Sequence, residues 1–171
     1  MESGHTPILQ KEVYIFSGDI LSGKSTSLGK WCQSRNDVYG ILTPIENDKR
    51  IFMDISTGEK FAMEAKPDEV ATIFVGRYKF SMNSFSKAIQ ILTSGANHSS
   101  GWLVIDEIGP LELSGRGFDE ILTEILENAS AGMKLILVVR QSLRDNVVAR
   151  YGLNQHLLKE ANFLNGQDAF V

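Results

Sequence analysis

The stretch that decides the fold class lies near the amino terminus and reads Gly18-Asp19-Ile20-Leu21-Ser22-Gly23-Lys24-Ser25. It matches the pattern G-x-x-x-x-G-K-[ST] at every fixed position. Its two glycines let a loop wrap a phosphate chain with the backbone N–H groups pointing inward. An apolar run, Val13–Phe16, precedes the loop, and a helix is predicted from about Lys24 to Ser34. This strand, loop and helix context predicts a phosphate-binding loop.

The residue types in this loop indicate what it binds. The amino terminus of the following helix carries partial positive charge and favours an anion. We expect the Lys24 ammonium to reach the β- and γ-phosphates and the Ser25 hydroxyl to ligate Mg²⁺. The predicted nucleotide site is Gly18, Asp19, Ile20, Leu21, Ser22, Gly23, Lys24, Ser25 and Thr26.

A second motif follows the apolar run Trp102–Ile105, which ends in the carboxylates Asp106 and Glu107. An aspartate at such a strand end holds Mg²⁺ in phosphate-loop enzymes. Mg²⁺ is satisfied by one or two carboxylates together with waters and phosphate oxygens. We therefore predict Ser25 and Asp106 as metal ligands and Glu107 as the group that orients or deprotonates the attacking water.

The rest of the chain alternates short apolar strands with amphipathic helices. Strands are predicted at Val38–Leu42 and Leu135–Val139, and a helix is predicted around Phe118–Leu126. Further helices are expected from Ser84, as the cap, to Ser94 and from Leu143 to Tyr151, with Gly152 in the stop position. Alternating strands and helices predict a parallel sheet covered by helices on both faces.

Two segments depart from this rhythm. Arg50–Ile55 and Lys60–Met63 flank a turn-rich tetrapeptide, which predicts an antiparallel hairpin. Ala71–Phe80 is rich in β-branched and aromatic residues and is predicted as one further strand. Since no linker divides the chain, we expect a single domain over residues 1–171, with residues 1–10 as a loose leader.

Composition narrows the function classes. Hydrophobic residues make up 43% of the chain, charged residues 22%, and the formal net charge is −4. A general nucleic-acid binder usually carries a basic surplus, so we expect no nucleic-acid partner. The single cysteine, Cys32, excludes an internal disulfide and is expected to be a buried apolar residue.

The apolar runs are far shorter than the roughly 20 residues that span a bilayer, and the first twelve residues lack the apolar segment of a secretory signal. We therefore expect a cytoplasmic protein with no membrane association. A protein partner is not identified by the sequence.

The acidic motif also carries a family resemblance. Ile105-Asp106-Glu107-Ile108-Gly109, followed by Leu111-Glu112-Leu113, resembles the D-E-I-G-K-M-E-L signature of a small nucleoside-triphosphatase family. Further similarity is found in Gly40–Thr43, in Arg50–Glu59 and in Gly76-Arg77-Tyr78. The family includes thermophilic enzymes and a human cancer-related nucleoside triphosphatase.

The resemblance implies a P-loop α/β fold of the RecA-like type, a three-layer sandwich with a mostly parallel sheet and a β-hairpin insertion. It implies Mg²⁺-dependent hydrolysis of several nucleoside triphosphates to diphosphate and phosphate, with Lys24, Ser25, Asp106 and Glu107 in the roles given above. Pro110 stands where the family usually has lysine, so this chain needs another cation against the transferred phosphate.

Four arginines are candidates for that cation: Arg77, Arg116, Arg140 and Arg144. Arg116 lies in the loop Ser114-Gly115-Arg116-Gly117 just beyond the acidic motif, a suitable place for a lid or finger, and we predict it as catalytic together with Lys24 and Glu107. Arg140 and Arg144 flank the end of a predicted central strand, where strands in open α/β sheets meet their ligands.

Three functions stay open at this stage: an NTP hydrolase, a small-molecule or nucleoside kinase on the same fold, and a nucleotide-binding module without turnover. The acidic pair and the resemblance favour the hydrolase.

Overall fold

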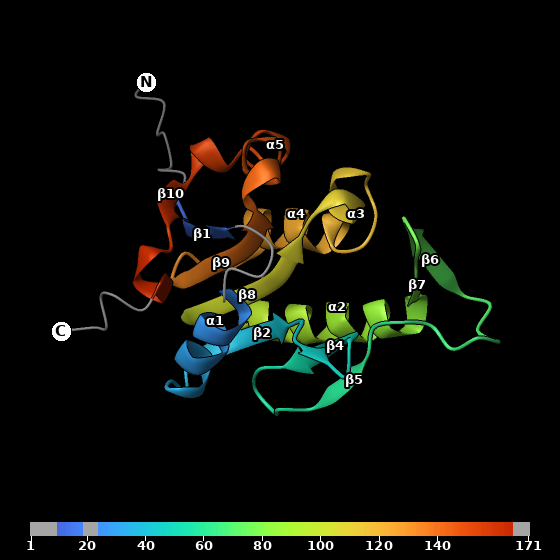
Figure 1. The fold of residues 1–171 in the computed structure, drawn as a ribbon. Coiled ribbons are helices and arrows are strands. Elements are labelled where there is room, and N and C mark those ends of the chain that lie inside the picture. Colours follow the sequence, from blue (N-terminus) through green and yellow to red (C-terminus); the bar gives the residue numbers. More distant parts are fainter. Residues whose placement is uncertain (1–9, 19–23, 166–171) are drawn as a thin grey trace, which may run out of the picture.

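The structure is a computed structural model, and it describes residues 10–18 and 24–165 (Figure 1). The strands are β1 (Glu12–Gly18), β2 (Val38–Leu42), β3 (Ile45–Glu46), β4 (Lys49–Asp54), β5 (Lys60–Ala62), β6 (Thr72–Val75), β7 (Tyr78–Ser81), β8 (Gly101–Ile108), β9 (Met133–Arg140) and β10 (Leu157–Glu160). The α-helices are α1 (Lys24–Gln33), α2 (Met82–Ala96), α3 (Pro110–Leu113), α4 (Asp119–Asn128) and α5 (Arg144–Arg150). Short 3₁₀ helices occupy Gln141–Leu143, Leu153–Gln155 and Asn162–Asn165.

The described residues form an eight-stranded sheet in which β10, β1, β9, β8 and β2 are parallel neighbours in that order. The antiparallel strands β4, β3 and β5 extend it beyond β2. Strands β4 and β5 form the expected hairpin, and β3 is a two-residue strand that also pairs with β4. Strand β9 thus lies between β1, which leads into the phosphate loop, and β8, which carries the acidic motif.

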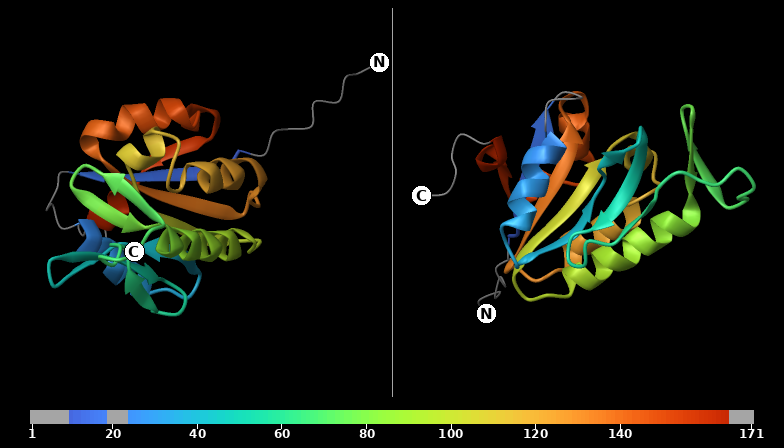
Figure 2. Two further views of the ribbon diagram at one scale, coloured as in Figure 1. Left: turned by 90° about the vertical axis from the view of Figure 1, so that its right-hand side faces the viewer. Right: turned by 60° about the horizontal axis from the view of Figure 1, so that its bottom comes forward.

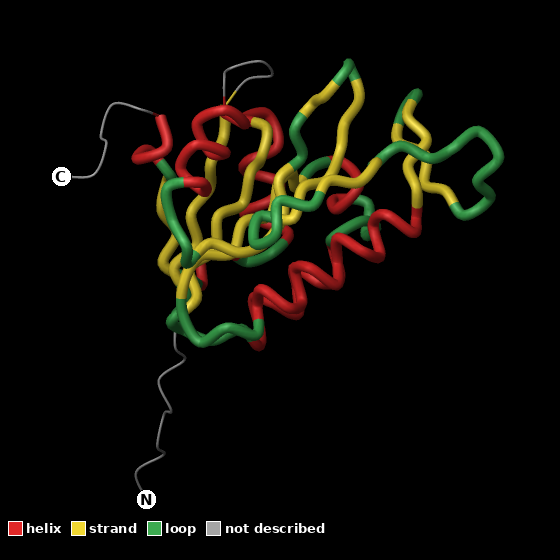
Figure 3. The backbone as a smooth tube through the Cα atoms, turned by 90° about the horizontal axis from the view of Figure 1, so that it is seen from below, coloured by secondary structure: helices red, strands yellow, loops and turns green. Residues whose placement is uncertain are grey.

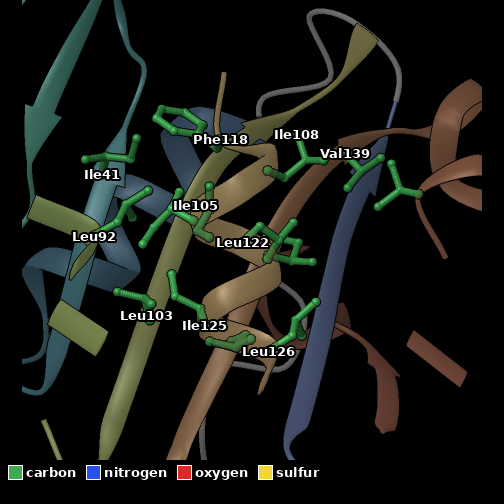
Figure 4. Packing of buried hydrophobic residues seen from close by; sticks show 14 of the residues in the cluster. Ile41, Leu92, Leu103, Ile105, Ile108, Phe118, Leu122, Ile125, Leu126 and Val139 are labelled. Carbon is green, nitrogen blue, oxygen red and sulfur yellow. The ribbon is translucent and has the colours of Figure 1, made fainter. Parts of the chain in front are cut away.

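Side chains of the central strands alternate between two apolar cores, because successive residues of a strand point to opposite faces. On one face Leu103 and Ile105 pack with α2, α4 and α5, as the labelled side chains of Figure 4 show in part. On the other face Trp102 and Val104 pack with α1 and the 3₁₀ helix Asn162–Asn165. Figure 2 shows α1 and α2 on opposite faces of the sheet. The predicted α/β layering is confirmed.

The segment predicted as one strand, Ala71–Phe80, is instead a hairpin of two strands, β6 and β7. Val75 pairs with Tyr78, so Gly76 and Arg77 form a two-residue loop. Gly76 has φ +56°, a conformation that glycine adopts without strain and that such loops require. The hairpin stands apart from the main sheet at the start of α2 (Figure 3).

The start of α2 also differs from the prediction. The cap is Ser81, whose hydroxyl oxygen accepts the N–H of Ser84 at 3.2 Å. Ser84, predicted as the cap, therefore lies in the first turn. Phe85, Ala88 and Leu92 form the buried face of this helix, as their spacing predicts.

Three features of the structure are not predicted from the sequence. Strand β8 continues through Asp106 and Glu107 to Ile108. The short helix α3 follows it at once, and β10 adds a parallel edge strand beside β1. Within residues 10–18 and 24–165, no helix is long and apolar enough to cross a membrane.

Candidate nucleotide site

Three strands end together at one edge of the sheet and position the candidate site. Gly18, the last residue of β1, is in register with Arg140, the last residue of β9. Asp106 of β8 is in register with Val138, two residues earlier on β9. The entrance to the phosphate loop and the acidic motif therefore lie at the same edge, separated by a single strand.

Asp106 is a buried carboxylate, with 3% of its surface exposed. Its Oδ2 accepts the backbone N–H of Thr43, the residue after β2, at 3.1 Å. Burial, opposed by this hydrogen bond, raises the pKa of Asp106 to about 6. The charged form therefore gains from a cation placed beside it.

Glu107 follows through a cis peptide bond and is held by Arg140. The Arg140 Nε and the Glu107 Oε1 are 3.2 Å apart, and both side chains are partly buried. Arg140 thus lies between the end of β1 and the acidic motif. Of the four arginine candidates, it is the one whose backbone register and ion pair both place it at this edge.

Asp106 forms part of the wall of two cavities. The first, of about 290 Å³, lies against α1 and β2, and Thr26 also lines it. The second, of about 230 Å³, extends from Asp106 and Glu107 under the β6–β7 hairpin. The first turn of α1 and the end of β8 consequently share one cavity, as a bound phosphate chain with its metal would require.

Glu112 shapes the loop that follows β8. Its Oε2 accepts the N–H of Gly109 at 2.9 Å and its Oε1 accepts the N–H of Phe118 at 3.2 Å. The side chain therefore caps the start of α3 and ties it to the start of α4. Pro110 occupies the first position of α3, where a missing N–H is harmless.

The predicted phosphate-loop residues Asp19, Ile20, Leu21, Ser22 and Gly23 lie outside the described residues. Lys24 and Ser25 open α1, but the description does not extend to their side chains or to that of Gly18. The structure brings together the end of β1, Thr26, Asp106 and Glu107 from the predicted set.

The other arginine candidates lie elsewhere. Arg116 is exposed, its Nε donates to Ser114 Oγ at 3.3 Å, and it lines neither cavity. Arg144 pairs with Glu160 of β10. Arg77 lines the second cavity from the tip of the hairpin.

Two contributors are missing from the sequence prediction. Thr43 ends the Gly40–Thr43 stretch of the resemblance, but its backbone N–H is a donor to Asp106 and a backbone role is not indicated by residue type. Arg50 of β4 lines the second cavity, although its Lys49-Arg50 context is that of an ordinary solvated hairpin.

Asp106 fits the role of a magnesium ligand. It is a buried carboxylate beside the cavity that α1 also lines, and Thr43 donates hydrogen bonds to it through its backbone N–H and its side chain. The remaining ligands would be Ser25 and phosphate oxygens.

Comparison with known proteins places this arrangement in a family. The model of a family described as NTPase matches residues 13–159. The chain belongs to this NTPase family. Nucleotide binding and NTP hydrolysis, in general terms, are therefore supported for this NTPase-family chain. No curated protein matches it.

Two solved structures are similar to this NTPase-family chain. One is the crystal structure of THEP1 from the hyperthermophile Aquifex aeolicus, with TM-score 0.68 and 20% identity over 90% of this chain and 93% of that chain. The other is the solution structure of a human cancer-related nucleoside triphosphatase, with TM-score 0.61 and 22% identity over 87% of each chain. At these identities the likeness establishes the fold.

Proposed function

We propose that this chain hydrolyses nucleoside triphosphates, ATP and GTP among them, to diphosphate and phosphate in a Mg²⁺-dependent reaction. The observation that carries the proposal is the meeting of three strand ends: Gly18 beside Arg140, and Arg140 paired with Glu107. A carboxylate beside the expected position of the γ-phosphate is the group that hydrolysis requires.

In this reaction the oxygen of a water molecule attacks the γ-phosphorus, and the bond to the oxygen bridging the β- and γ-phosphates breaks. The water proton passes to Glu107, which Arg140 holds in place. Lys24 and the phosphate-loop amides bind the phosphate chain. Asp106 and Ser25 would hold Mg²⁺, which neutralises negative charge on the phosphate oxygens when bound.

The cation that replaces the missing lysine at position 110 is Arg140 in this proposal. Its guanidinium already lies at the sheet edge, whereas Arg116 reaches only Ser114. Arg116 stays a second candidate, because it lies in the loop between α3 and α4, shortly after the carboxyl end of β8. A cytoplasmic location and the absence of a nucleic-acid partner stay predictions from the sequence.

A small-molecule kinase is the second candidate function, since Glu107 also lines the cavity that extends away from β1. In a kinase an acceptor hydroxyl from that cavity would take the place of water.

The test is phosphate release from ATP, GTP, CTP and UTP with and without Mg²⁺, comparing the native chain with Glu107→Gln. We expect Mg²⁺-dependent release that the substitution lowers by about 10²- to 10⁴-fold. Nucleotide binding without release by the native chain would reject intrinsic hydrolysis and leave the kinase or a non-hydrolysing binding module. Arg116→Ala and Arg140→Ala, measured in parallel, separate the two cation candidates.

A further inference from the structure

The second cavity extends from the acidic motif away from α1, none of whose residues lines it. In the sheet order, β1 is two strands from β8 on one side, whereas the cavity is lined from β8 in the opposite direction, by Thr43 after β2 and by Arg50 of β4. The β6–β7 hairpin and α3 form its other sides, and Figure 1 shows the hairpin standing across from α3. Asp106, Glu107 and Arg140 also line it, so a molecule in this cavity would lie beside the expected position of the γ-phosphate and away from α1.

Aromatic rings form much of its lining. Phe80, Phe85 and Phe118 are buried, and the rings of Phe85 and Phe118 lie 5.2 Å apart. Tyr78, with 39% of its surface exposed, stacks on Phe80 at 5.8 Å with an interplanar angle of 5°. Flat apolar molecules gain most from such walls, because ring stacking adds to the burial of apolar surface.

Two guanidinium groups in this cavity form no ion pair with a carboxylate among the described residues. Among the described residues, no hydrogen bond or ion pair holds the Arg50 guanidinium, which Asp106 attracts at longer range. The Arg77 guanidinium contacts its neighbour Tyr78, with the hydroxyl 3.1 Å away and the ring centroid 5.2 Å away. The hairpin tip and β4 thus present positive charge above an apolar floor. A guanidinium matches the geometry of a phosphate or carboxylate better than that of any neutral group.

The acidic groups of the cavity do not cancel these two charges. Glu107 is paired with Arg140, and both oxygens of Glu112 accept backbone N–H groups. Asp106 accepts from Thr43 and attracts Arg50 at longer range, without an ion pair between them. Arg50 and Arg77 are therefore the groups left for an incoming anion.

The volume limits the size of the occupant. A cavity of 150 Å³ in another protein accepts benzene, so about 230 Å³ accommodates an aromatic ring with a small charged substituent. We propose that this cavity binds a small aromatic anion, with its ring against Tyr78 and Phe80 and its phosphate or carboxylate against Arg50 and Arg77. This proposal concerns binding, and it does not depend on hydrolysis.

The test is calorimetric titration of the full chain saturated with ADP and Mg²⁺, so that the phosphate-loop site is occupied. The probes are phenyl phosphate and benzoate, which distinguish a phosphate from a carboxylate head group. The control ligands are inorganic phosphate, which lacks the aromatic ring, and benzyl alcohol, which lacks the negative charge. We expect at least one aromatic anion to bind about tenfold or more tightly than both of these controls.

Variants locate the binding. Arg50→Ala and Arg77→Ala are each expected to weaken the binding of the aromatic anion by about tenfold. Lys49→Ala removes the same charge from the neighbouring position of β4, outside the cavity, and is expected to leave binding unchanged. Thermal melting verifies that each variant folds. If Arg50→Ala does not fold, Arg77→Ala, on an exposed turn, provides the test.

Failure of both aromatic anions to bind, or equal binding by the native chain and both arginine variants, would overturn the proposal. A failure of ADP itself to bind is a separate result. It counts against the proposed hydrolase, and the cavity is then titrated without nucleotide.

Discussion

At the scale of single residues, the site depends on how Glu107 is held. Its carboxylate has one charged partner among the described residues, the Arg140 guanidinium at 3.2 Å. Arg140 is in turn anchored by β9, in register with the last residue of β1. A shift of the sheet edge would therefore move the arginine and the glutamate together.

Removing this arginine is the first prediction. Arg140→Ala is expected to lower NTP hydrolysis by about 100-fold, because a misplacement of about 1 Å in a catalytic group has an effect of that size. Phosphate release at saturating ATP measures it. Lys134→Ala, at the other end of the same strand, is the matched control and should retain the native rate. A native rate in a folded Arg140→Ala would show that Glu107 does not need this partner.

Glu112 provides a prediction for pH. Burial raises its pKa to about 7 from an ordinary value of 4.5, so the folded chain binds this proton more tightly than the unfolded chain. Its contribution to the unfolding free energy is therefore fully present below about pH 4.5 and is lost as the pH rises to about 7.

Urea unfolding between pH 4.5 and 8 tests this contribution against Glu112→Gln, which cannot titrate. The native chain should lose stability relative to the variant as the pH rises. If the stability of the native chain relative to the variant stays constant or increases as the pH rises, the raised pKa of Glu112 is contradicted. The neighbouring carboxylate of Glu107 is present in both chains, so its effect largely cancels.

At the scale of elements, the strong periodic patterns predict what the structure contains. The apolar runs of β8 and β9 and the helical spacing of α4 are recovered, because each depends on burial that the local sequence encodes. Segments with a weak periodic pattern are not predicted from the sequence. Strand β10, Leu157–Glu160, ends in two exposed charged residues, Lys159 and Glu160, and shows no alternation of apolar and polar residues. Its strand conformation depends on its pairing with β1.

The hairpin illustrates a recoverable error. Ala71–Phe80 has the composition of one strand, but Gly76 carries the turn signal that divides it. The site contains residues that the sequence does not identify. Asp106 and Glu107 are identified by sequence, whereas the Thr43 amide reaches Asp106 through the parallel pairing of β2 with β8, and Arg50 reaches the site through the antiparallel pairing of β4 with β2.

The cap of α2 gives an element-scale prediction. Ser81→Ala should lower the unfolding free energy by about 1 kcal/mol, since it removes the acceptor for the Ser84 N–H. Ser84→Ala, three residues later, should change it by less than about 0.5 kcal/mol. Chemical denaturation of both variants measures the difference, and a larger loss for Ser84→Ala would restore the cap predicted from sequence.

At the scale of the whole molecule, the carboxyl-terminal segment from β10 to Leu164 belongs to the core. Strand β10 pairs with β1, and Leu164 is 2% exposed within the core that α1 covers. Phe163 adds ring contacts with Tyr14, Trp31 and Trp102. The strand that leads into the phosphate loop is thus flanked on its outer edge by the last strand of the sheet.

Leu164→Ala should therefore destabilise the whole chain by about 2–5 kcal/mol, the range for truncating a buried leucine. Leu157→Ala, in the same segment but 45% exposed, should have a much smaller effect. Thermal unfolding followed by circular dichroism compares the two. Equal melting temperatures for the two variants would show that the segment is not part of the cooperative unit.

The aromatic cluster around Phe163 determines what tryptophan fluorescence can report. The chain has two tryptophans, and both Trp31 and Trp102 belong to this cluster, 5.2 Å apart. Trp102 lies at the start of β8, four residues before Asp106, or about 13 Å along the strand. Intrinsic emission is therefore a direct signal for the docking of the carboxyl-terminal segment, and ligands beside Glu107 are better followed by calorimetry or by a dye attached near the hairpin.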